Sequence, residues 1–191
     1  MNSVVSTAPP LLNEAANLPA MPEESATTVG FLGISQMSIP IINKLAINVK
    51  IIAYNKDVNK FKSVLMALKK WTPVDVVMEA ELIFCCVSNS KVACRMLLQQ
   101  CRVLNMLRPR KMYVELTTLH ADTARDIAQA VRFKGSLFLE EQMMGDAIQA
   151  AEGNLTLLTS GDKNIILLHP ATFNVMSQNI KYFGDTGVAS N

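Results

Sequence analysis

The chain has 191 residues, of which 50% are hydrophobic and 18% are charged, and its formal net charge is +2. This length and composition suffice for one ordinary domain with a sizeable core and a tail. Without a signal-peptide pattern or an apolar run of 18 residues, the sequence argues against a secreted or membrane protein, so we expect a soluble intracellular one.

Residues 1–28 are expected to form a disordered tail or linker. They are rich in Ala, Pro, Ser, Thr and Asn, show no hydrophobic period, and contain four prolines that would break a helix. Their only charged side chains are three glutamates. Residues 29–191 therefore hold all 18 basic residues against 13 acidic ones, a net charge of about +5, and are expected to form the folded domain.

From Val29 onward, short apolar runs alternate with segments of helical periodicity. The predicted strands are 29–33, 49–54, 82–87, 112–116, 137–139, 155–159 and 180–183. The predicted helices are 36–46, 57 to about 68, 73–79, 88 to about 98, 121–132, and a weaker one that opens at Asp162. This alternation with short connections predicts βαβ units and therefore an α/β fold with a doubly wound, mostly parallel sheet.

Seven lysines lie between residues 44 and 70, a stretch whose only acidic residue is Asp57. Three interpretations fit this cluster: a solvated helix face, a contact with a cofactor phosphate, or a contact with a nucleic-acid backbone. The stretch lacks the interleaved aromatic residues that would indicate specific base recognition.

The four cysteines do not follow a metal-binding pattern. Cys85 and Cys86 are adjacent in a predicted strand, whereas Cys94 and Cys101 are seven residues apart on a predicted helix. A CxxC motif is missing and the chain has only two histidines, so we expect no metal site. Buried free thiols are the expected state of these cysteines.

Isolated residues give no catalytic constellation. His120 is expected to cap a helix or to be solvated, and His169 is expected in a surface loop. Trp71 is interpreted as a packing residue. Glu140 and Glu141 are adjacent, and adjacent residues on a strand point to opposite faces, which argues against a paired acid and base. We therefore predict no catalytic residue.

The most informative segment is a buried strand followed by a turn and a helix, residues 29–38. A dinucleotide fold places three glycines in such a turn, which allow the bend, the approach of the pyrophosphate, and close packing of helix and strand. Here these positions hold Gly33, Ser35 and Ser38. If Ser35 requires a positive φ, strain of about 1 kcal/mol or more follows, although its hydroxyl group could donate to a phosphate. This predicts a weakened phosphate turn.

The end of the second predicted strand carries Asn55 and Lys56. Folds that prefer NAD place an acidic residue here, which binds the ribose 2′-hydroxyl group. A neutral hydrogen-bonding residue next to a cation suits the 2′-phosphate of NADP instead. The alternative is that Lys56 simply starts a loop.

In their order and spacing, these segments resemble the NADP-binding domain of the β-hydroxyacid dehydrogenase family. The resemblance implies a Rossmann-type fold for residues 29–191. Within the family, the chain is most similar to the dehydrogenase-like domain of a chromatin-associated nuclear factor, called a glyoxylate reductase homologue. The motifs that carry the resemblance are Gly30-Phe31-Leu32-Gly33 with Met37, Tyr54-Asn55-Lys56, Cys86-Val87-Ser88-Asn89, Arg108-Pro109, Tyr113 to Thr118, and Ala121-Asp122-Thr123.

The resemblance also implies which residues would hold the cofactor. The pyrophosphate would lie along the turn, and the 2′-phosphate would face the end of the second predicted strand. The ribose and nicotinamide would lie beyond the predicted strand 82–87, and one further residue would occupy the family's position for Ser or Thr near the nicotinamide and the substrate. These residues are, in the same order, Gly33, Ile34, Ser35, Gln36 and Met37; Asn55 and Lys56; Val87, Ser88 and Asn89; and Thr117.

Departures from the family lie in the substrate loop and near the end of the chain. Met144 occupies the position of the serine that binds a substrate carboxylate, while Gly145 is retained in this vestigial loop. Asp146 would place an adverse negative charge beside it. Residues 184–187 match the family's entry into a long helix that bears the catalytic lysine. The sequence stops at Asn191, before this lysine, and we expect the family's C-terminal helical domain to be lacking.

These observations predict a degenerate, non-catalytic relative of the β-hydroxyacid dehydrogenases with weak residual NADP(H) binding and an interaction or scaffold role. The alternative is an active NADP-dependent reductase of small hydroxy or oxo acids. Apolar surface near the last strand and residues 184–191 predicts self-association or a protein partner. By resemblance, the protein would be nuclear and associated with chromatin, through nucleosomes or DNA; a cytoplasmic location is the alternative.

Overall fold

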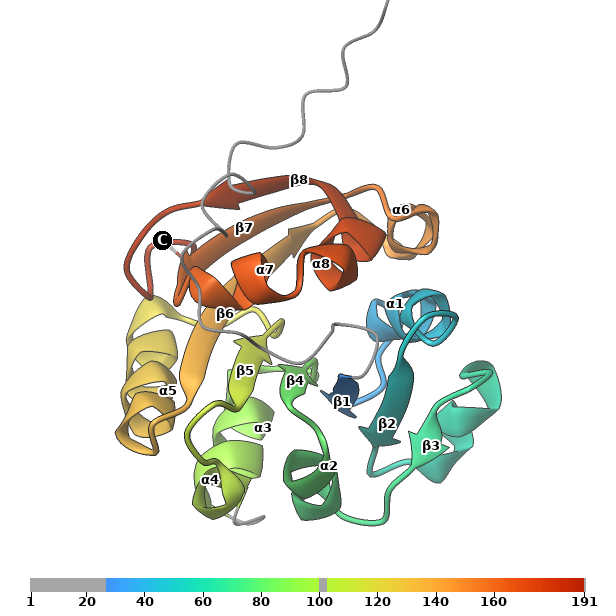
Figure 1. Cartoon of the computed structure of the whole chain (residues 1–191), viewed down its shortest axis with the longest axis horizontal. Coiled ribbons are helices and arrows are strands. Elements are labelled where there is room, and N and C mark those ends of the chain that lie inside the picture. Colours follow the sequence, from blue (N-terminus) through green and yellow to red (C-terminus); the bar gives the residue numbers. More distant parts are fainter. Residues whose placement is uncertain (1–26, 100–102, 191) are drawn as a thin grey trace, which may run out of the picture.

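An eight-stranded sheet forms the centre of the computed structural model, which describes residues 27–99 and 103–190 (Figure 1). The strand order is β3-β2-β1-β4-β5-β6-β7-β8. Neighbouring strands are parallel except for the antiparallel pair β6 and β7, which confirms the predicted doubly wound, mostly parallel sheet. The strands are β1 (Thr28–Leu32), β2 (Lys50–Tyr54), β3 (Leu68–Lys69), β4 (Leu82–Cys85), β5 (Met112–Glu115), β6 (Leu137–Met144), β7 (Leu155–Gly161) and β8 (Ser177–Tyr182).

Helices cover both faces of the sheet (Figure 1). The helices on one face are α1 (Ser38–Leu45), α6 (Ala147–Glu152), α7 (Asn164–Leu168) and α8 (Pro170–Met176). The other face is covered by α2 (Pro73–Glu79), α3 (Ser90–Cys94), the π-helix η4 (Arg95–Gln99), α4 (Val103–Met106) and α5 (Ala121–Phe133). The 3₁₀-helix η3 (Val58–Ser63) connects β2 to β3.

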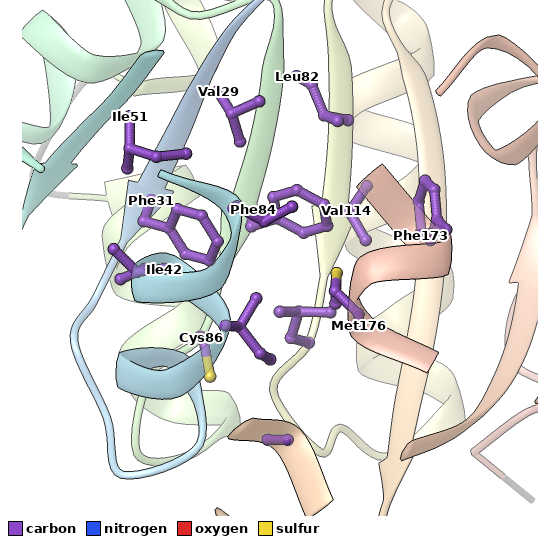
Figure 2. Close-up of a cluster of buried hydrophobic side chains, with 14 of the residues drawn as sticks. Val29, Phe31, Ile42, Ile51, Leu82, Phe84, Cys86, Val114, Phe173 and Met176 are labelled. Carbon is purple, nitrogen blue, oxygen red and sulfur yellow. The ribbon is translucent and has the colours of Figure 1, made fainter. Parts of the chain in front are cut away.

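The central strands are buried on both faces, as their continuous apolar runs predict. On the α1 face, Phe31 stacks on Phe84 with ring centroids 5.1 Å apart, and Phe84 meets the edge of Phe173 at 6.1 Å (Figure 2). On the opposite face, α2 lies so close to β1 that a Cβ atom at Gly30 would lie 2.6 Å from a methyl group of Val76. This packing fixes the end of β1, where the predicted turn begins.

Local capping explains two helix starts. Thr72 and Asp75 form a capping box around Pro73 at the start of α2, and the predicted bounds of this helix are confirmed. The next helix was predicted to begin at residue 88, but it begins at Ser90, because the side chain of Asn89 caps it by accepting a hydrogen bond from the Val92 N–H group. Asparagine and serine are about equally good capping residues, so the residue types alone did not distinguish the two neighbours.

The helix predicted from residue 57 to about 68 is wrong. Asp57 does cap a helix, by accepting from the Asn59 N–H group, but this helix is the short η3. None of the residues of η3 is buried, so tertiary packing does not support a longer helix here. The chain then forms β3, a short edge strand that pairs with β2.

Strand β6 is longer than predicted, because residues 140–144 pair with β7 instead of forming a loop. Glu140 and Glu141 are both buried within it. The helix predicted to open at Asp162 begins at Asn164, as α7. The carboxyl group of Asp162 accepts a hydrogen bond from the Phe138 N–H group and pairs with Arg132. The region after it contains two helices, α7 and α8.

Two of the isolated side chains lie elsewhere than predicted. His169 is only 3% exposed, so its assignment to a surface loop is wrong, and Trp71 is 77% exposed instead of packed in the core. The Lys69 ammonium group lies 3.8 Å from the centre of the Trp71 ring. His120 is solvent-exposed and its side chain makes no capping hydrogen bond.

Cys85 and Cys86 are buried free thiols and Cys94 is a partly buried one, whereas Cys101 and nearly all of the predicted tail lie outside the described residues. Within the described ranges, no helix is both long and apolar enough to cross a membrane.

Candidate functional site

A cleft opens at the carboxyl ends of β1, β2, β4 and β5, where the strand order changes direction. Open α/β sheets bind ligands at such a switch point. The cleft contains two cavities of about 400 and about 520 Å³. The two cavities are neighbours, because they share part of their lining. The shared residues are Ser35, Lys60, Cys86, Val87 and Ser88.

The turn after β1 depends on Gly33. This residue has φ = 99°, in the region that favours glycine. Its N–H group donates to the Tyr54 carbonyl group at 2.8 Å, and a Cβ atom here would lie 2.4 Å from the Cys86 carbonyl oxygen. Gly33 therefore brings β1, β2 and β4 together at the floor of the cleft.

We predict that Gly33→Ala lowers the free energy of unfolding by about 2 kcal/mol, because the left-handed backbone and the contact with the Cys86 carbonyl group both oppose a side chain. Urea unfolding followed by circular dichroism measures this loss. Gly184→Ala is a matched control, since Gly184 has φ = 84° but open space at its Cβ position. An equal loss in the two variants would contradict the role given to the close contact.

Ser35 and Ser38 bond to each other across the turn. The Ser35 N–H group donates to Ser38 Oγ at 2.8 Å, and the Ser38 N–H group donates to Ser35 Oγ at 3.1 Å. Ser35 Oγ also lies 3.2 Å from Cys86 Sγ. Ser35 does not have a positive φ, so the condition for backbone strain is not met and no such strain is expected. The two hydroxyl oxygens instead accept from the N–H groups of Ser35 and Ser38, which would face an anion in a glycine-rich turn.

Asn55 is positioned by the same turn. Its side-chain oxygen accepts from the Ile34 N–H group at 2.9 Å, and its amide donates to the Asp57 carbonyl group at 2.8 Å. Asn55 therefore organises the loop after β2. Lys56 lines the larger cavity and is solvent-exposed; among the described residues it has no ion-pair partner.

Lys60 belongs to the cleft, although its position in the lysine-rich stretch gave no reason to single it out. Its ammonium group donates to the Ile34 carbonyl oxygen at 2.8 Å and lines both cavities. Asp57 begins the helix that carries Lys60 across the loop. The cation therefore lies where the two cavities join.

The far side of the cleft is built by the ends of β4 and β5. The Val87 N–H group donates to Thr117 Oγ1 at 3.1 Å, and the Thr117 N–H group donates to Glu115 Oε1 at 3.0 Å. Of the residues predicted for the ribose and nicotinamide, Val87, Ser88 and Thr117 line the cavities, whereas Asn89 is not among the lining residues and its side chain caps α3.

Two buried acidic groups near the cleft have perturbed protonation. Burial raises the pKa of Glu115 to about 7, against the hydrogen bonds from Thr117, Cys85 and Tyr113. Burial likewise raises the pKa of the Cys86 thiol to about 11. The Cys86 thiol is therefore protonated at neutral pH and is a poor nucleophile.

The vestigial loop is only partly at the cleft. Gly145 and Met143 line the smaller cavity, whereas Met144 is 56% exposed and is not among the lining residues. The carboxyl group of Asp146, expected to face the loop, accepts from two N–H groups at the start of α6 in a capping box with Gln149. The position matched to the family's substrate serine therefore does not contribute to the cavity.

The residues of the turn after β1 line both cavities. Ser35, Gln36 and Met37 line the smaller cavity, and Gly33 and Ile34 line the larger one. In the parts of the chain that the structure describes, no three His, Cys, Asp or Glu side chains gather in a manner suited to a metal ion. The chemistry of this lining suits an organic ligand with phosphate groups.

Comparison with known families supports a nucleotide site. The family model of the NAD binding domain of 6-phosphogluconate dehydrogenase matches residues 28–184. The cytokine-like nuclear factor N-PAC of Drosophila pseudoobscura is 33% identical over 181 residues, which cover 93% of this chain and 29% of that protein. The human N-PAC is 30% identical over 165 residues, 85% of this chain and 30% of its own. The chain thus spans about a third of the length of these relatives.

Solved structures share the fold at low sequence identity. A 3-hydroxyisobutyrate dehydrogenase of Mycobacterium tuberculosis, solved with L-serine, superposes with a TM-score of 0.78 at 20% identity, covering 86% of this chain and 57% of that one. An imine reductase of Myxococcus stipitatus in complex with NADP⁺ gives 0.78 at 24% identity, covering 85% and 57%. The described domain therefore corresponds to little more than half of each enzyme chain.

Proposed function

The chain belongs to the family of the NAD binding domain of 6-phosphogluconate dehydrogenase, and from this premise we propose that it is a non-catalytic relative of the β-hydroxyacid dehydrogenases that retains weak NADP(H) binding. The observation that carries the proposal is the cleft itself. Its two cavities lie at the switch point of the sheet, and Lys56 stands beside the larger one. The fold is kept while the phosphate turn is altered.

The absence of turnover is supported by the lining of the smaller cavity. Reduction of a carbonyl group requires a proton donor held within reach of the reacting oxygen. Among the described residues of this lining, neither a histidine nor a carboxylic acid is present. Burial raises the pKa of the Cys86 thiol, which makes it a poor proton donor. The Lys60 ammonium group uses one of its three N–H groups to donate to the Ile34 carbonyl oxygen, which holds it at the turn.

A preference for NADPH over NADH is supported by Lys56 at the end of β2. A cation here suits a 2′-phosphate, whereas an acidic residue at this position would bind the 2′-hydroxyl group of NADH. The imine reductase that shares this fold was solved with NADP⁺. NADPH, when bound, would supply a hydride; this chain's own residues would only hold the nucleotide.

We predict that Lys56→Ala weakens NADPH binding about tenfold or more in isothermal titration, since it removes a charge-assisted contact with phosphate. NADH binding should not change. Lys62→Ala is the matched control, because Lys62 is an exposed lysine of the same stretch that does not line a cavity. If Lys56→Ala weakened NADH binding as much as NADPH binding, Lys56 would not be the residue that recognises the 2′-phosphate. If the parent chain bound neither NADPH nor NADH, the proposed function would be overturned.

The alternative function is an active NADP-dependent reductase of small hydroxy or oxo acids. Consumption of NADPH by the full chain with a small aldehyde acid, at ordinary enzymatic rates of about 1 per second or more, would establish it and overturn the non-catalytic proposal. Nucleotide binding without such consumption is the expected result.

We further propose that the chain acts as an interaction module, and that it self-associates through apolar side chains near its last strand. Phe183, which follows β8, and Val188 are both exposed, and the formal net charge of +2 opposes association only weakly. Phe183→Ser with Val188→Ser should shift the mass in light scattering toward the monomer. Phe133→Ser, on the exposed side of α5, is the control. A parent chain that stays monomeric at high concentration would contradict this proposal.

A nuclear, chromatin-associated role is supported by the relatives that are named nuclear factors and by the basic balance of residues 29–191. If the chain contacts DNA through its lysines, binding should weaken linearly with the logarithm of salt concentration, with a slope of several counterions. Binding that does not respond to salt, or no binding to duplex DNA, would count against this role.

A further inference from the structure

We propose that the hydroxyl groups of Ser35 and Ser38 take the place of a diphosphate in the turn, so that the cleft holds a 2′-phosphorylated adenosine nucleotide by its adenosine end alone. This inference rests on the proposed function, because it concerns the same cleft. In this arrangement the chain recognises the adenosine end of the ligand, and Ser35 and Ser38 keep the diphosphate from binding tightly.

The turn has few free donors for a phosphate. The N–H groups of Ser35 and Ser38 are bonded to the hydroxyl group of the other serine. The Ile34 N–H group is bonded to Asn55, and the Gly33 N–H group is bonded to Tyr54. The N–H groups of Gln36 and Met37 are the two between Gly33 and Ser38 that have no internal hydrogen bond among the described residues. To use the other four as well, a phosphate would have to displace internal hydrogen bonds of nearly equal strength, so its net gain from them would be small.

The serine pair is also held in place from outside the turn. Ser38 is fully buried at the start of α1, and its hydroxyl group lies within 3.5 Å of the Gly33 carbonyl oxygen. The Ser35 hydroxyl group touches the buried Cys86 thiol at 3.2 Å. Release of the pair would therefore disturb contacts with β4 as well as within the turn.

The adenosine half of the cleft is in contrast open and suited to a ligand. The larger cavity has a volume of about 520 Å³, within the range of small-molecule sites. Its walls are mainly apolar side chains that suit a flat base, and Lys56 stands at its edge as a cation for a phosphate. The apolar wall consists of Ile34, Tyr54, Val87, Val92 and Met96.

The bonded turn and the open adenosine half predict how tightly adenosine 2′-monophosphate binds relative to NADPH. Adenosine 2′-monophosphate, which has no group to place in the turn, should bind nearly as well as NADPH. In an open turn, by contrast, each charge-assisted hydrogen bond from an N–H group to the diphosphate would strengthen NADPH binding by about tenfold or more. The ratio of the two affinities therefore measures what the turn contributes.

The experiment is isothermal titration of the full chain with NADPH and with adenosine 2′-monophosphate. In the parent protein, we expect the two dissociation constants to agree within about threefold. In the double variant Ser35→Ala with Ser38→Ala, which frees both N–H groups and keeps both Cβ atoms, NADPH should bind about tenfold more tightly or better, because a freed donor gains a full hydrogen bond. Binding of adenosine 2′-monophosphate should not change.

The outcomes separate the inference from the function it rests on. Binding of NADPH to the parent protein about 30-fold tighter than adenosine 2′-monophosphate would overturn the inference and leave NADP(H) binding intact. Absence of binding of both ligands would overturn the proposed function and the inference with it. If the double variant unfolds, as circular dichroism would reveal, the affinity ratio in the parent protein decides alone.

A second variant tests the recognised end. Lys56→Ala should weaken both ligands by the same factor, because each places a 2′-phosphate at this cation. A loss for NADPH alone would show that the two ligands do not share the adenosine site and would overturn the inference.

Discussion

Replacement of Glu141 by glutamine should raise the free energy of unfolding at pH 9 by roughly 4 kcal/mol. Glu141 is fully buried in β6, and neither of its carboxyl oxygens has a hydrogen-bond partner among the described residues. Burial alone raises its pKa from 4.5 to about 8. At pH 9 the parent protein must therefore hold an unpaired charge in its core, which the amide avoids.

The same shift predicts how stability depends on pH. A group whose pKa is higher in the folded state holds its proton more tightly there, so its contribution is complete below pH 4.5 and is lost as the pH rises through about 8. Glu115 adds a contribution that is lost between 4.5 and about 7. The parent protein should be most stable near pH 5 and should lose several kcal/mol by pH 9.

Urea unfolding at pH 5, 7 and 9, followed by circular dichroism, measures both effects. Glu141→Gln should remove the loss between pH 7 and 9 and about half of the loss between pH 5 and 7. The other half of the loss below pH 7, which belongs to Glu115, should remain. A parent protein whose stability does not change over this range would show that Glu141 is not buried without partners.

Replacement of the neighbouring Glu140 should have the opposite effect. Glu140 points to the other face of β6, where its carboxyl group accepts from the Gly187 N–H group and from Ser160 Oγ, each at 2.8 Å, and from Ser190 Oγ. Glu140→Ala leaves these donors without an acceptor and opens a cavity. We expect the free energy of unfolding to fall by about 4 kcal/mol.

The loss should be local in origin, because the hydrogen bonds of Glu140 attach residues 187–190 to the sheet. Hydrogen exchange of the Gly187 amide should accelerate strongly in Glu140→Ala. Glu140→Gln is the matched control, since its side-chain oxygen can still accept from Gly187 and its amide can donate to Ser190; it should lose much less stability. Slow exchange at Gly187 in the alanine variant would disprove the attachment.

The sequence was sufficient to predict the elements that bury a regular apolar pattern. The run of β4 is apolar at every position and is buried throughout, and α2 begins at a capping box with proline at its first position. The apolar run and the capping box are both local signals, so they do not depend on residues that are distant in the sequence.

Elements whose pattern depends on distant partners were not predictable in the same way. The second half of β6 contains the acidic pair Glu140 and Glu141, which resembles a loop in sequence. It becomes a strand because β7 pairs with it from Leu139 to Met144. Whether each carboxyl group finds hydrogen-bond donors depends on which residues cover it. Residues 187–190 donate to the carboxyl group of Glu140 and not to that of Glu141.

In the candidate site, too, the residues with a local sequence signal were predicted, and those placed by distant parts of the chain were not. Gly33, Ser35 and Thr117 were found because a family motif and a turn geometry mark them. Lys60 and Met143 were missed, since a lysine among seven and a methionine in a presumed loop carry no local signal. Lys60 reaches the cleft through a 3₁₀-helix, and Met143 does so through the extension of β6.

The exposed indole of Trp71 determines how this protein can be studied by fluorescence. It is the only tryptophan in the chain, it is 77% exposed, and it carries the Lys69 ammonium group over its ring. Native emission should already resemble that of indole in water and should be quenched readily by acrylamide. Denaturation will change that signal little, whereas a partner that covers the edge strand β3 should shift it to shorter wavelength.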